Sequence, residues 1–242
     1  DGIDSLHKLV ILVALAFGKT IRPDSVHVAG IRKIDAADIA YAEEFGYAIR
    51  LLAVARDTAA GVEARVHPSM VPRSHLLANV SGAFNAICIR GKALGTSIYY
   101  GQGAGMMPTA TAVLADIMEA AGAMRDDSAN RVLPYGQPVD QLRPAPVVPM
   151  GRTEHEYYIR FHVADRPGVL ARISRILGSA GISIATVAQH EASRRGSVPV
   201  VIRTYRAGEA AMRRALARIA SLKDSRAQPV VIRVEEALGR QA

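Results

Sequence analysis

The order of apolar segments after residue 154 constrains the fold of this chain more than any other feature. Six segments follow one another in the order strand, helix, strand, strand, helix, strand. They cover residues 155–164, 167–181, 182–191, 198–205, 208–221 and 229–236. This βαββαβ order packs both helices on one face of an antiparallel sheet, so we expect a ferredoxin-like domain there.

A proline-rich segment, residues 125–154, precedes this domain. It holds five of the twelve prolines and shows neither helical nor alternating periodicity. Because proline fixes φ and lacks a backbone N–H, we expect an extended linker or a connection that follows the surface. The predicted units are therefore a first domain over 1–124, the linker over 125–154 and a second domain over 155–242.

The first domain mixes helical and strand-like patterns. Helices are expected over 3–17, 35–46 and 108–124. Strands are expected over 47–56, 62–72, 78–90 and 93–103. Asp35 can cap the second helix, and Pro68 or Pro72 should end the second strand. The fold class is predicted to be α/β (α+β), with a mixed sheet preceding the ferredoxin-like domain.

Composition argues against several kinds of protein. The net charge of +8 lies in residues 151–242, because acidic and basic residues are equal in number before them. The excess is scattered arginine without an aromatic-rich pattern, which argues against nucleic acid as a partner. No stretch reaches the length of a membrane span, and no histidine–carboxylate cluster has metal-site spacing. The single cysteine, Cys88, excludes an internal disulfide and suits a buried thiol in a reduced, cytoplasmic setting.

The string ADRPGVLARIS at 164–174 places a turn and a helix N-terminus directly after the first strand of the second domain. Together with GISI at 181–184, it resembles the ACT domains, which bind amino acids and regulate metabolic enzymes. The resemblance covers about residues 155–236. It implies a ligand site between paired domains, formed by Asp165, Gly168, Val169, Leu170 and Ser183. Many amino-acid-binding members carry Asn near Ser183, and a purely structural, dimer-forming role is the alternative.

Three ordered motifs lie in the first domain. They are GIDSLHKLVILVALAFG at 2–18, EARVHPSMVPRSHLLANVSGAFNAICIRG at 63–91 and GTSIYYGQGAGMMPTATAV at 95–113. The motifs resemble the catalytic domain of homoserine dehydrogenase over about residues 1–122. The resemblance implies an NAD(P)-dependent oxidoreductase that interconverts L-aspartate-4-semialdehyde and L-homoserine, on the route to threonine and methionine. It also makes L-threonine the expected effector of the ACT domain.

Asp4 and Lys8 lie four residues apart, on one face of the first turns of the predicted helix. By resemblance, Lys8 is the catalytic lysine that protonates the substrate oxygen, and Asp4 holds the substrate ammonium. A positioned ammonium can stabilise and neutralise the negative charge that develops on a carbonyl oxygen during reduction. The alternative is an ordinary surface ion pair between residues i and i+4.

The glycine-rich turn GQGAG at 101–105 is too short for a dinucleotide fingerprint. By resemblance, it lies beside the nicotinamide end of NAD or NADP, with Gly103, Ala104 and Gly105 as contacts. Family members often carry Pro and Gly where Gln102 and Met106 stand, so a simple helix-entry turn is the alternative.

The chain contains no strand–turn–helix unit with a glycine-rich dinucleotide motif, and it opens on Asp1. We therefore expect a processed, truncated or partly observed product that is inactive alone. The resemblance implies a homodimer or homotetramer. A non-catalytic, dimeric amino-acid sensor is the alternative function.

Overall fold

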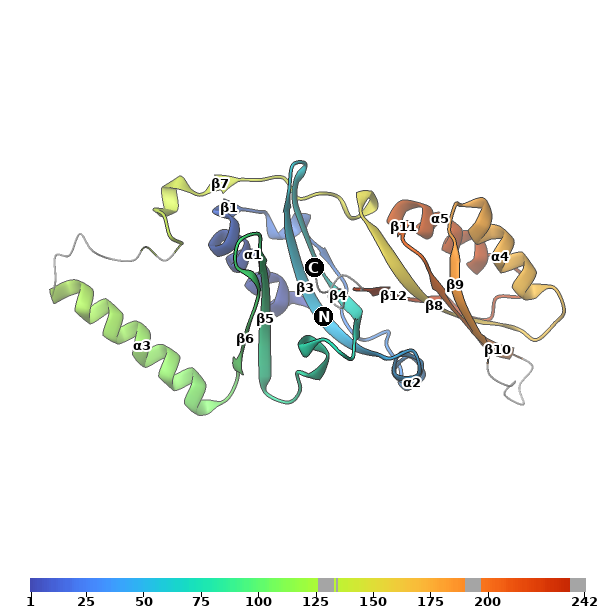
Figure 1. Ribbon diagram of the computed structural model, residues 1–242, viewed down its shortest axis with the longest axis horizontal. Coiled ribbons are helices and arrows are strands. Elements are labelled where there is room, and N and C mark those ends of the chain that lie inside the picture. The colour runs from blue at the N-terminus through green and yellow to red at the C-terminus, as the bar shows by residue number, and fades with distance from the viewer. Residues whose placement is uncertain (126–132, 134, 190–196, 236–242) are drawn as a thin grey trace.

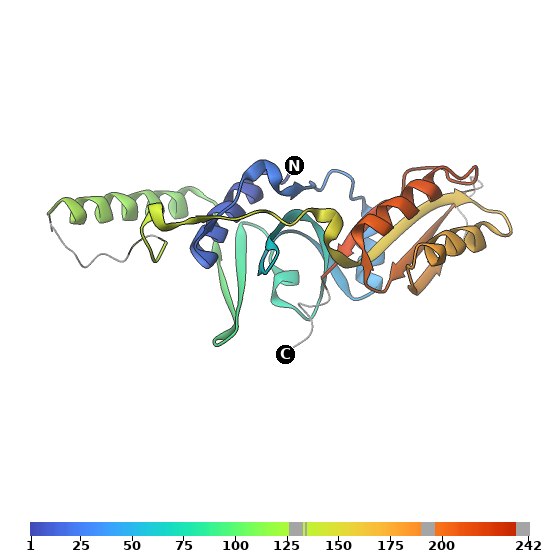
Figure 2. The ribbon, with the colours of Figure 1, turned by 90° about the horizontal axis from the view of Figure 1, so that it is seen from above.

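The computed structural model describes residues 1–125, 133, 135–189 and 197–235 (Figures 1 and 2). Its first part, residues 1–125, follows the predicted order of helices and strands. The elements of this part are α1 (Ile3–Phe17), β1 (Lys19–Thr20), β2 (His27–Val28), α2 (Ala36–Glu44), β3 (Tyr47–Thr58), β4 (Gly61–Pro72), β5 (Phe84–Gly91), β6 (Gly95–Gln102) and α3 (Met106–Arg125). The predicted cap of α2 is confirmed: Asp35 accepts from the Asp38 backbone N–H, and Asp38 accepts in return from that of Asp35.

The chain after residue 142 contains the predicted βαββαβ unit. The elements of the unit are β8 (Glu154–Ala164), α4 (Val169–Ser179), β9 (Ile184–Gln189), β10 (Ser197–Thr204), α5 (Glu209–Ala220) and β12 (Val230–Val234). Two short strands, β7 (Arg143–Pro144) and β11 (Ala207–Gly208), also lie in this part of the chain. The strands lie in the order β12-β8-β10-β9, and each neighbouring pair is antiparallel. This is the ferredoxin-like arrangement expected from the sequence. The turn expected between β9 and β10 lies outside the described residues.

Strand β8 is apolar along most of its length because both faces of its sheet are covered. Tyr157, Ile159 and Phe161 face one core, which they share with α4 and α5. Tyr158 faces the other core, which it shares with Tyr41 of α2 and with β4 and β12. The period-2 geometry of a strand therefore divides β8 between two hydrophobic layers.

The two parts share one sheet. Strand β12 pairs antiparallel with β8 and parallel with β4, through Arg233–Ser69 and Val234–Met70. The main path of this eight-stranded sheet is β2-β4-β12-β8-β10-β9, with β3 added to β4 and β11 to β8. We call the region where β4 and α2 meet β8 and β12 the junction.

Residues 143–148 of the proline-rich segment lie along the surface of the first part. Strand β7 pairs parallel with β1, and Val147 forms a bridge with Val62 of β4. The Val62 N–H donates to the Pro146 carbonyl, and the Val148 N–H donates to the Val62 carbonyl. These contacts match the surface-following form of the predicted connection.

The expected end of β4 is confirmed, because the strand ends at Pro72, one of the two prolines expected to end it. It continues through Pro68, which lies between the residues that pair with β2 and those that pair with β12. One detail of the first part differs from the sequence-based expectation. The strand expected from residue 78 begins only at Phe84, since Leu76–Asn79 forms a 3₁₀ turn whose N-cap is His75.

The hairpin β5–β6 and helix α3 extend away from the shared sheet, and we call them the arm (Figures 1 and 2). The hairpin forms a sheet of two strands, separate from the larger sheet. Many large apolar side chains of the arm are exposed, among them Ile87, Tyr99, Leu114, Ile117 and Met118. No helix among the described residues is long and apolar enough to cross a membrane.

Candidate functional site

The predicted catalytic pair lies at the start of α1. Gly2 is the N-cap of this helix with φ 88°, a left-handed conformation that favours glycine. Two residues later, the Asp4 carboxylate meets the Lys8 ammonium, with 2.8 Å between Oδ2 and Nζ. Both side chains are mostly exposed, 79% for Asp4 and 61% for Lys8. An acid and an amine are thus held together where another molecule can reach both.

The opposite face of α1 fixes this pair in position. Leu9 and Val13 are buried against Val62, Ala64 and Val66 of β4. Burial of two large aliphatic side chains contributes roughly 3–6 kcal/mol relative to exposure. The helix is therefore anchored to the sheet while Asp4 and Lys8 face solvent.

The predicted cofactor turn, Gly103–Gly105, joins β6 to α3 and is exposed. The Gly103 N–H donates to the Ala83 carbonyl at 3.2 Å, and a Cβ at Gly103 would collide with the Asn85 side chain. Gly105 has φ 125°, which L side chains rarely adopt. Packing at Gly103 and backbone conformation at Gly105 therefore each favour glycine, without any contact to a cofactor. The exposed backbone suits one edge of a dinucleotide, and the contact with NAD(P) stays a prediction.

The predicted effector residues lie at the N-terminus of α4 and before β9. Gly168 caps α4 with φ 85°, and Asp165 and Ser183 are exposed. Val169 is buried, and its N–H donates weakly to the Arg166 carbonyl at 3.4 Å. Leu170 is partly exposed. Asp165 and Gly168 lie at the N-terminal end of α4, whereas Ser183 lies beyond its C-terminal end, where the Ile182 N–H donates to the Leu177 carbonyl and the Tyr205 N–H to the Ser183 carbonyl. Within one chain the predicted residues therefore do not meet, and nothing in the structure tests whether an amino acid binds them.

The predicted site residues therefore fall in separate places, namely the start of α1, the turn between β6 and α3, and the two ends of α4. Figure 1 shows α3 at one end of the molecule and α4 at the other, with α1 between them. No hydrogen bond or ion pair of the described residues joins the Asp4–Lys8 pair to the turn or to α4. The three groups can cooperate only through the intervening sheet or through a further molecule.

Sequence reasoning missed the charged network of the junction. Arg160 of β8 is buried and donates from Nε to Asp38 Oδ1 at 2.7 Å and from Nη2 to Asp35 Oδ2 at 2.5 Å. Tyr158 donates its hydroxyl to the same Asp38 oxygen at 3.0 Å. The hydrogen bonds with Asp38 raise the pKa of Arg160. The carboxylates that cap α2 thus also hold the second part of the chain.

A second buried carboxylate belongs to the first residue of α5. Glu209 accepts two hydrogen bonds from Arg233, at 2.5 and 3.0 Å, and one each from Arg213 and Tyr157. Burial alone would raise its pKa, but the bonds and charges of Arg233 and Arg213 lower it to about 2. Glu209 is therefore charged at physiological pH and links β12, β8 and α5.

Two buried histidines also line the junction. His155 pairs with Thr153 Oγ1 at 2.8 Å, and burial together with the charges of Arg65 and Arg233 lowers its pKa to about 3. Burial likewise lowers the pKa of His67, whose Nδ1 lies 3.0 Å from Ser69 Oγ. Both rings are neutral at physiological pH. Within the described part of the chain, no group of three potential ligands could hold a metal ion.

Cys88, the single cysteine, lies on β5 of the arm. It is partly rather than fully buried, and burial raises the pKa of its thiol. Because the thiolate is the reactive form, this environment does not activate it as a nucleophile.

Known proteins match both parts of the chain. The family model for homoserine dehydrogenase matches residues 1–118, and that for the ACT domain matches residues 157–224. A homoserine dehydrogenase from Pseudomonas aeruginosa is 42% identical over 237 residues, which cover 98% of this chain and 55% of that protein. The homoserine dehydrogenase of Neisseria gonorrhoeae is 38% identical, over 97% of this chain and 54% of its own length.

A solved structure of a homoserine dehydrogenase is also similar to this chain. The crystal structure of a homoserine dehydrogenase from Thiobacillus denitrificans is 40% identical, with a TM-score of 0.86, over 97% of this chain and 53% of that one. The chain thus spans about half the length of the relatives that it matches. Residues 1–118 belong to the homoserine dehydrogenase family, and residues 157–224 form an ACT domain.

Proposed function

We propose that this chain supplies the catalytic and regulatory portion of an NAD(P)-dependent homoserine dehydrogenase. The reaction is the interconversion of L-aspartate-4-semialdehyde and L-homoserine. The observation that carries the proposal is the Asp4–Lys8 pair on the anchored helix α1, within the region that matches the family. The relatives are homoserine dehydrogenases, and this supplies the substrate class.

Each member of the pair has a chemical task in this reaction. The Asp4 carboxylate receives the ammonium group that both substrates carry. The Lys8 ammonium has three N–H donors, so one can meet Asp4 while another faces the substrate oxygen. As the aldehyde is reduced, Lys8 stabilises the developing alkoxide and then donates a proton to it. The nicotinamide cofactor, when bound, supplies or accepts the hydride.

The cofactor site is proposed to lie mostly outside this chain. The turn at Gly103, Ala104 and Gly105 would contribute one edge, and the chain spans only about half of its relatives. We expect the domain layout 1–124, 125–154 and 155–242. The preference between NAD and NADP depends on residues that bind the ribose. Isothermal titration of the 242-residue chain with NADPH should show weak binding, and sub-micromolar binding would overturn this part of the proposal.

The ACT domain is proposed to regulate the enzyme by binding L-threonine at Asp165, Gly168, Val169, Leu170 and Ser183. The resemblance to ACT domains and the exposed N-terminus of α4 support this assignment. We further propose a cytoplasmic homo-oligomer in threonine and methionine biosynthesis. An assay of the full-length protein across L-threonine concentrations should show graded inhibition or activation. A flat response would leave the ACT domain with a structural role.

The experiment that tests the catalytic proposal is the steady-state kinetics of the full-length protein with Lys8→Ala. The variant should lose about 10²- to 10⁴-fold in kcat, because general acid catalysis contributes that much, while cofactor affinity stays near that of the wild type. Lys92→Ala is the control, since Lys92 is also exposed but lies in the β5–β6 turn. Equal activity of the Lys8 variant and the control would remove Lys8 from the mechanism.

A further inference from the structure

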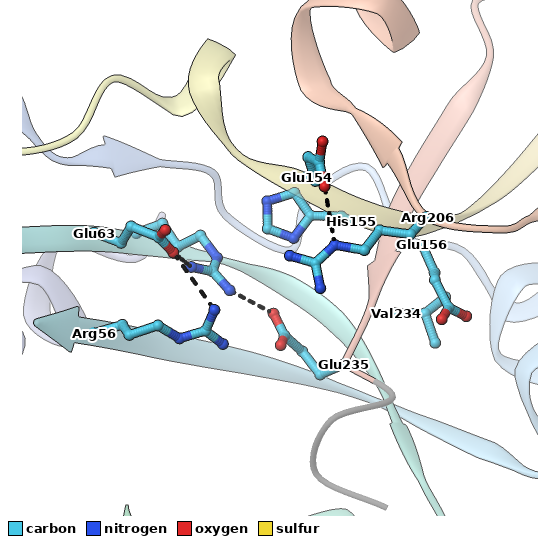
Figure 3. Close-up of a pocket in the computed structure, with 9 residues that line it drawn as sticks. Arg56, Glu63, Glu154, His155, Glu156, Arg206, Val234 and Glu235 are labelled. Atoms are coloured by element: carbon cyan, nitrogen blue, oxygen red, sulfur yellow. Dashed lines mark hydrogen bonds and ion pairs between the residues drawn. The ribbon is translucent and has the colours of Figure 1, made fainter. Parts of the chain in front are cut away.

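A pocket lies at the junction, between the β3–β4 hairpin and the strands of the ACT domain (Figure 3). In the close-up, Arg56 and Glu63 lie on one side, Glu154 and Arg206 on the other, and Glu235 between them. Both parts of the chain contribute to its walls, three residues from the first part and six from the second. The lining residues are Arg56, Glu63, Arg65, Glu154, His155, Glu156, Arg206, Val234 and Glu235.

The innermost arginine of this pocket has unsatisfied hydrogen-bond donors. Arg65 is 2% exposed and donates from Nη2 to Glu235 Oε1 at 3.0 Å. Its Nε and Nη1 are buried without a hydrogen-bond partner, and Nη1 lies 3.5 Å from Glu63 Oε2. A guanidinium has five donors arranged for bidentate contact with carboxylates. Buried donors without partners are rare in native proteins, and a bound ion, ligand or water commonly explains them.

The two outer arginines are loosely paired. Arg56 Nη1 lies 3.9 Å from the same Glu63 oxygen, and Arg206 Nε lies 3.3 Å from Glu154. Both distances exceed those of a close charge-assisted hydrogen bond. Both arginine side chains are more than half exposed, so they can turn toward an incoming anion with little rearrangement.

The mixture of charges selects the kind of ligand. Three guanidinium groups face four carboxylates, while His155 is neutral at physiological pH. A polyvalent anion would be repelled by the glutamates, and a simple cation by the arginines. A molecule with one carboxylate and one ammonium satisfies both sets. We propose that the junction pocket binds a small zwitterionic α-amino acid, with its carboxylate on Arg56, Arg65 and Arg206 and its ammonium among the surrounding glutamates.

Ligand binding in this pocket affects how the two parts of the chain are arranged, because the pocket lies between them. Arg56, Glu63 and Arg65 belong to β3 and β4, whereas Arg206 and Glu235 belong to the ACT side. A ligand that contacts both sets favours the arrangement in which they face each other. This site is distinct from the expected effector residues around Gly168 and Ser183, because none of those residues lines the pocket.

The test measures binding and needs no turnover, so it stands apart from the proposed dehydrogenase activity. The full-length protein is screened by thermal shift with each proteinogenic L-amino acid, and the strongest stabiliser is titrated by calorimetry. Acetate and ethylamine, which each carry one of the two charges, serve as probe controls. We expect a Kd below about 1 mM for one amino acid and no stabilisation by either single-charge probe.

Variants then locate the site. The double variant Arg56→Ala/Arg206→Ala should fold, because both side chains are largely exposed, and should weaken binding by at least about tenfold. Arg152→Ala, which removes an exposed arginine that does not line the pocket, should bind the amino acid as the wild type does. The proposal is overturned if no amino acid binds, or if the double variant binds it as tightly as the wild type.

Discussion

Strand β8 and the hairpin β5–β6 are both rich in apolar residues, but they lie in opposite surroundings. Each face of β8 meets a core built by this chain, so Tyr157, Tyr158 and Ile159 are at most 1% exposed. The hairpin presents Ile87 at 39% and Tyr99 at 64% exposure. An apolar strand therefore indicates that a covering surface exists, and only the structure shows whether the same chain provides it.

The helices repeat this contrast. Helix α4 buries Val169, Ile173 and Leu177 on one face, against the sheet. Helix α3 exposes Ile117 and other large apolar residues over its whole length. An isolated helix of this size is marginal in water, and a two-stranded hairpin is no more stable. The described residues thus leave the apolar surface of the arm uncovered, whereas the sheet at the junction is covered on both faces.

The largest expected effect comes from breaking the junction at Arg160. Arg160→Leu would leave Asp38, which is 0% exposed, without its cation. Loss of one partner of a buried ion pair costs about 3–5 kcal/mol, so urea unfolding should show a decrease of that size in the free energy of unfolding. Arg22→Ala is the matched control, because Arg22 pairs with Asp24 on the exposed surface. An equally small change in both variants would show that the junction network does not hold the two parts together.

The second-largest effect is expected from acidification, which should lower the free energy of unfolding through the buried groups of the junction. His155 has a pKa of about 3 in the fold, against about 6.5 in the unfolded chain, so the unfolded state binds more protons between these values. Stability should therefore fall as pH decreases below 6.5, by about 2 kcal/mol at pH 5 from this residue. Glu209 adds a loss in the same direction, below about pH 4.5.

Urea unfolding of the wild type and of His155→Gln at pH 7.5 and at pH 5 checks this expectation. The variant cannot gain a proton at this position, so its loss of stability should be smaller. A wild type as stable at pH 5 as at pH 7.5 would contradict the neutral state of the buried histidines.

The smallest effect is expected on the arm. Ile117→Glu, on exposed α3, should leave the free energy of unfolding of the 242-residue chain within about 0.5 kcal/mol of the wild type. Ile219→Glu, at a fully buried position of α5, should prevent folding, because it places an unpaired charge in the core. In the full-length protein, Ile117→Glu should become clearly destabilising. The same small change in both lengths of protein would mean that nothing covers α3.

Local patterns were enough to predict most of the fold. Helical periodicity and the capping residue Asp35 predicted α2, and the βαββαβ order predicted the ferredoxin-like domain. The parallel pairing of β12 with β4 was not predicted, because it joins residues far apart in sequence and leaves no local periodicity. Pro68 shows the same limit: its tolerance within β4 depends on which strands lie beside it.

The candidate site was predictable to a lesser degree. Helical spacing alone indicated that Asp4 and Lys8 meet, as they do at 2.8 Å. Their chemical roles came from the resemblance, since spacing does not distinguish a catalytic pair from a surface ion pair. The Arg160–Asp38 network and the junction pocket could not be predicted, because each combines residues separated by more than a hundred positions. The reciprocal cap at Asp35 and Asp38 was the available signal, and it indicated a helix start rather than an interface.

The central claim is that this chain forms a complete junction and an arm that a longer protein covers. Hydrogen exchange of backbone amides, compared between the 242-residue chain and the full-length protein, tests it most directly. We expect β4, β8 and β12 to be protected equally in both, and α3 with β5 and β6 to exchange rapidly in the chain and slowly in the full-length protein. Equal exchange of α3 in the two proteins would contradict the account.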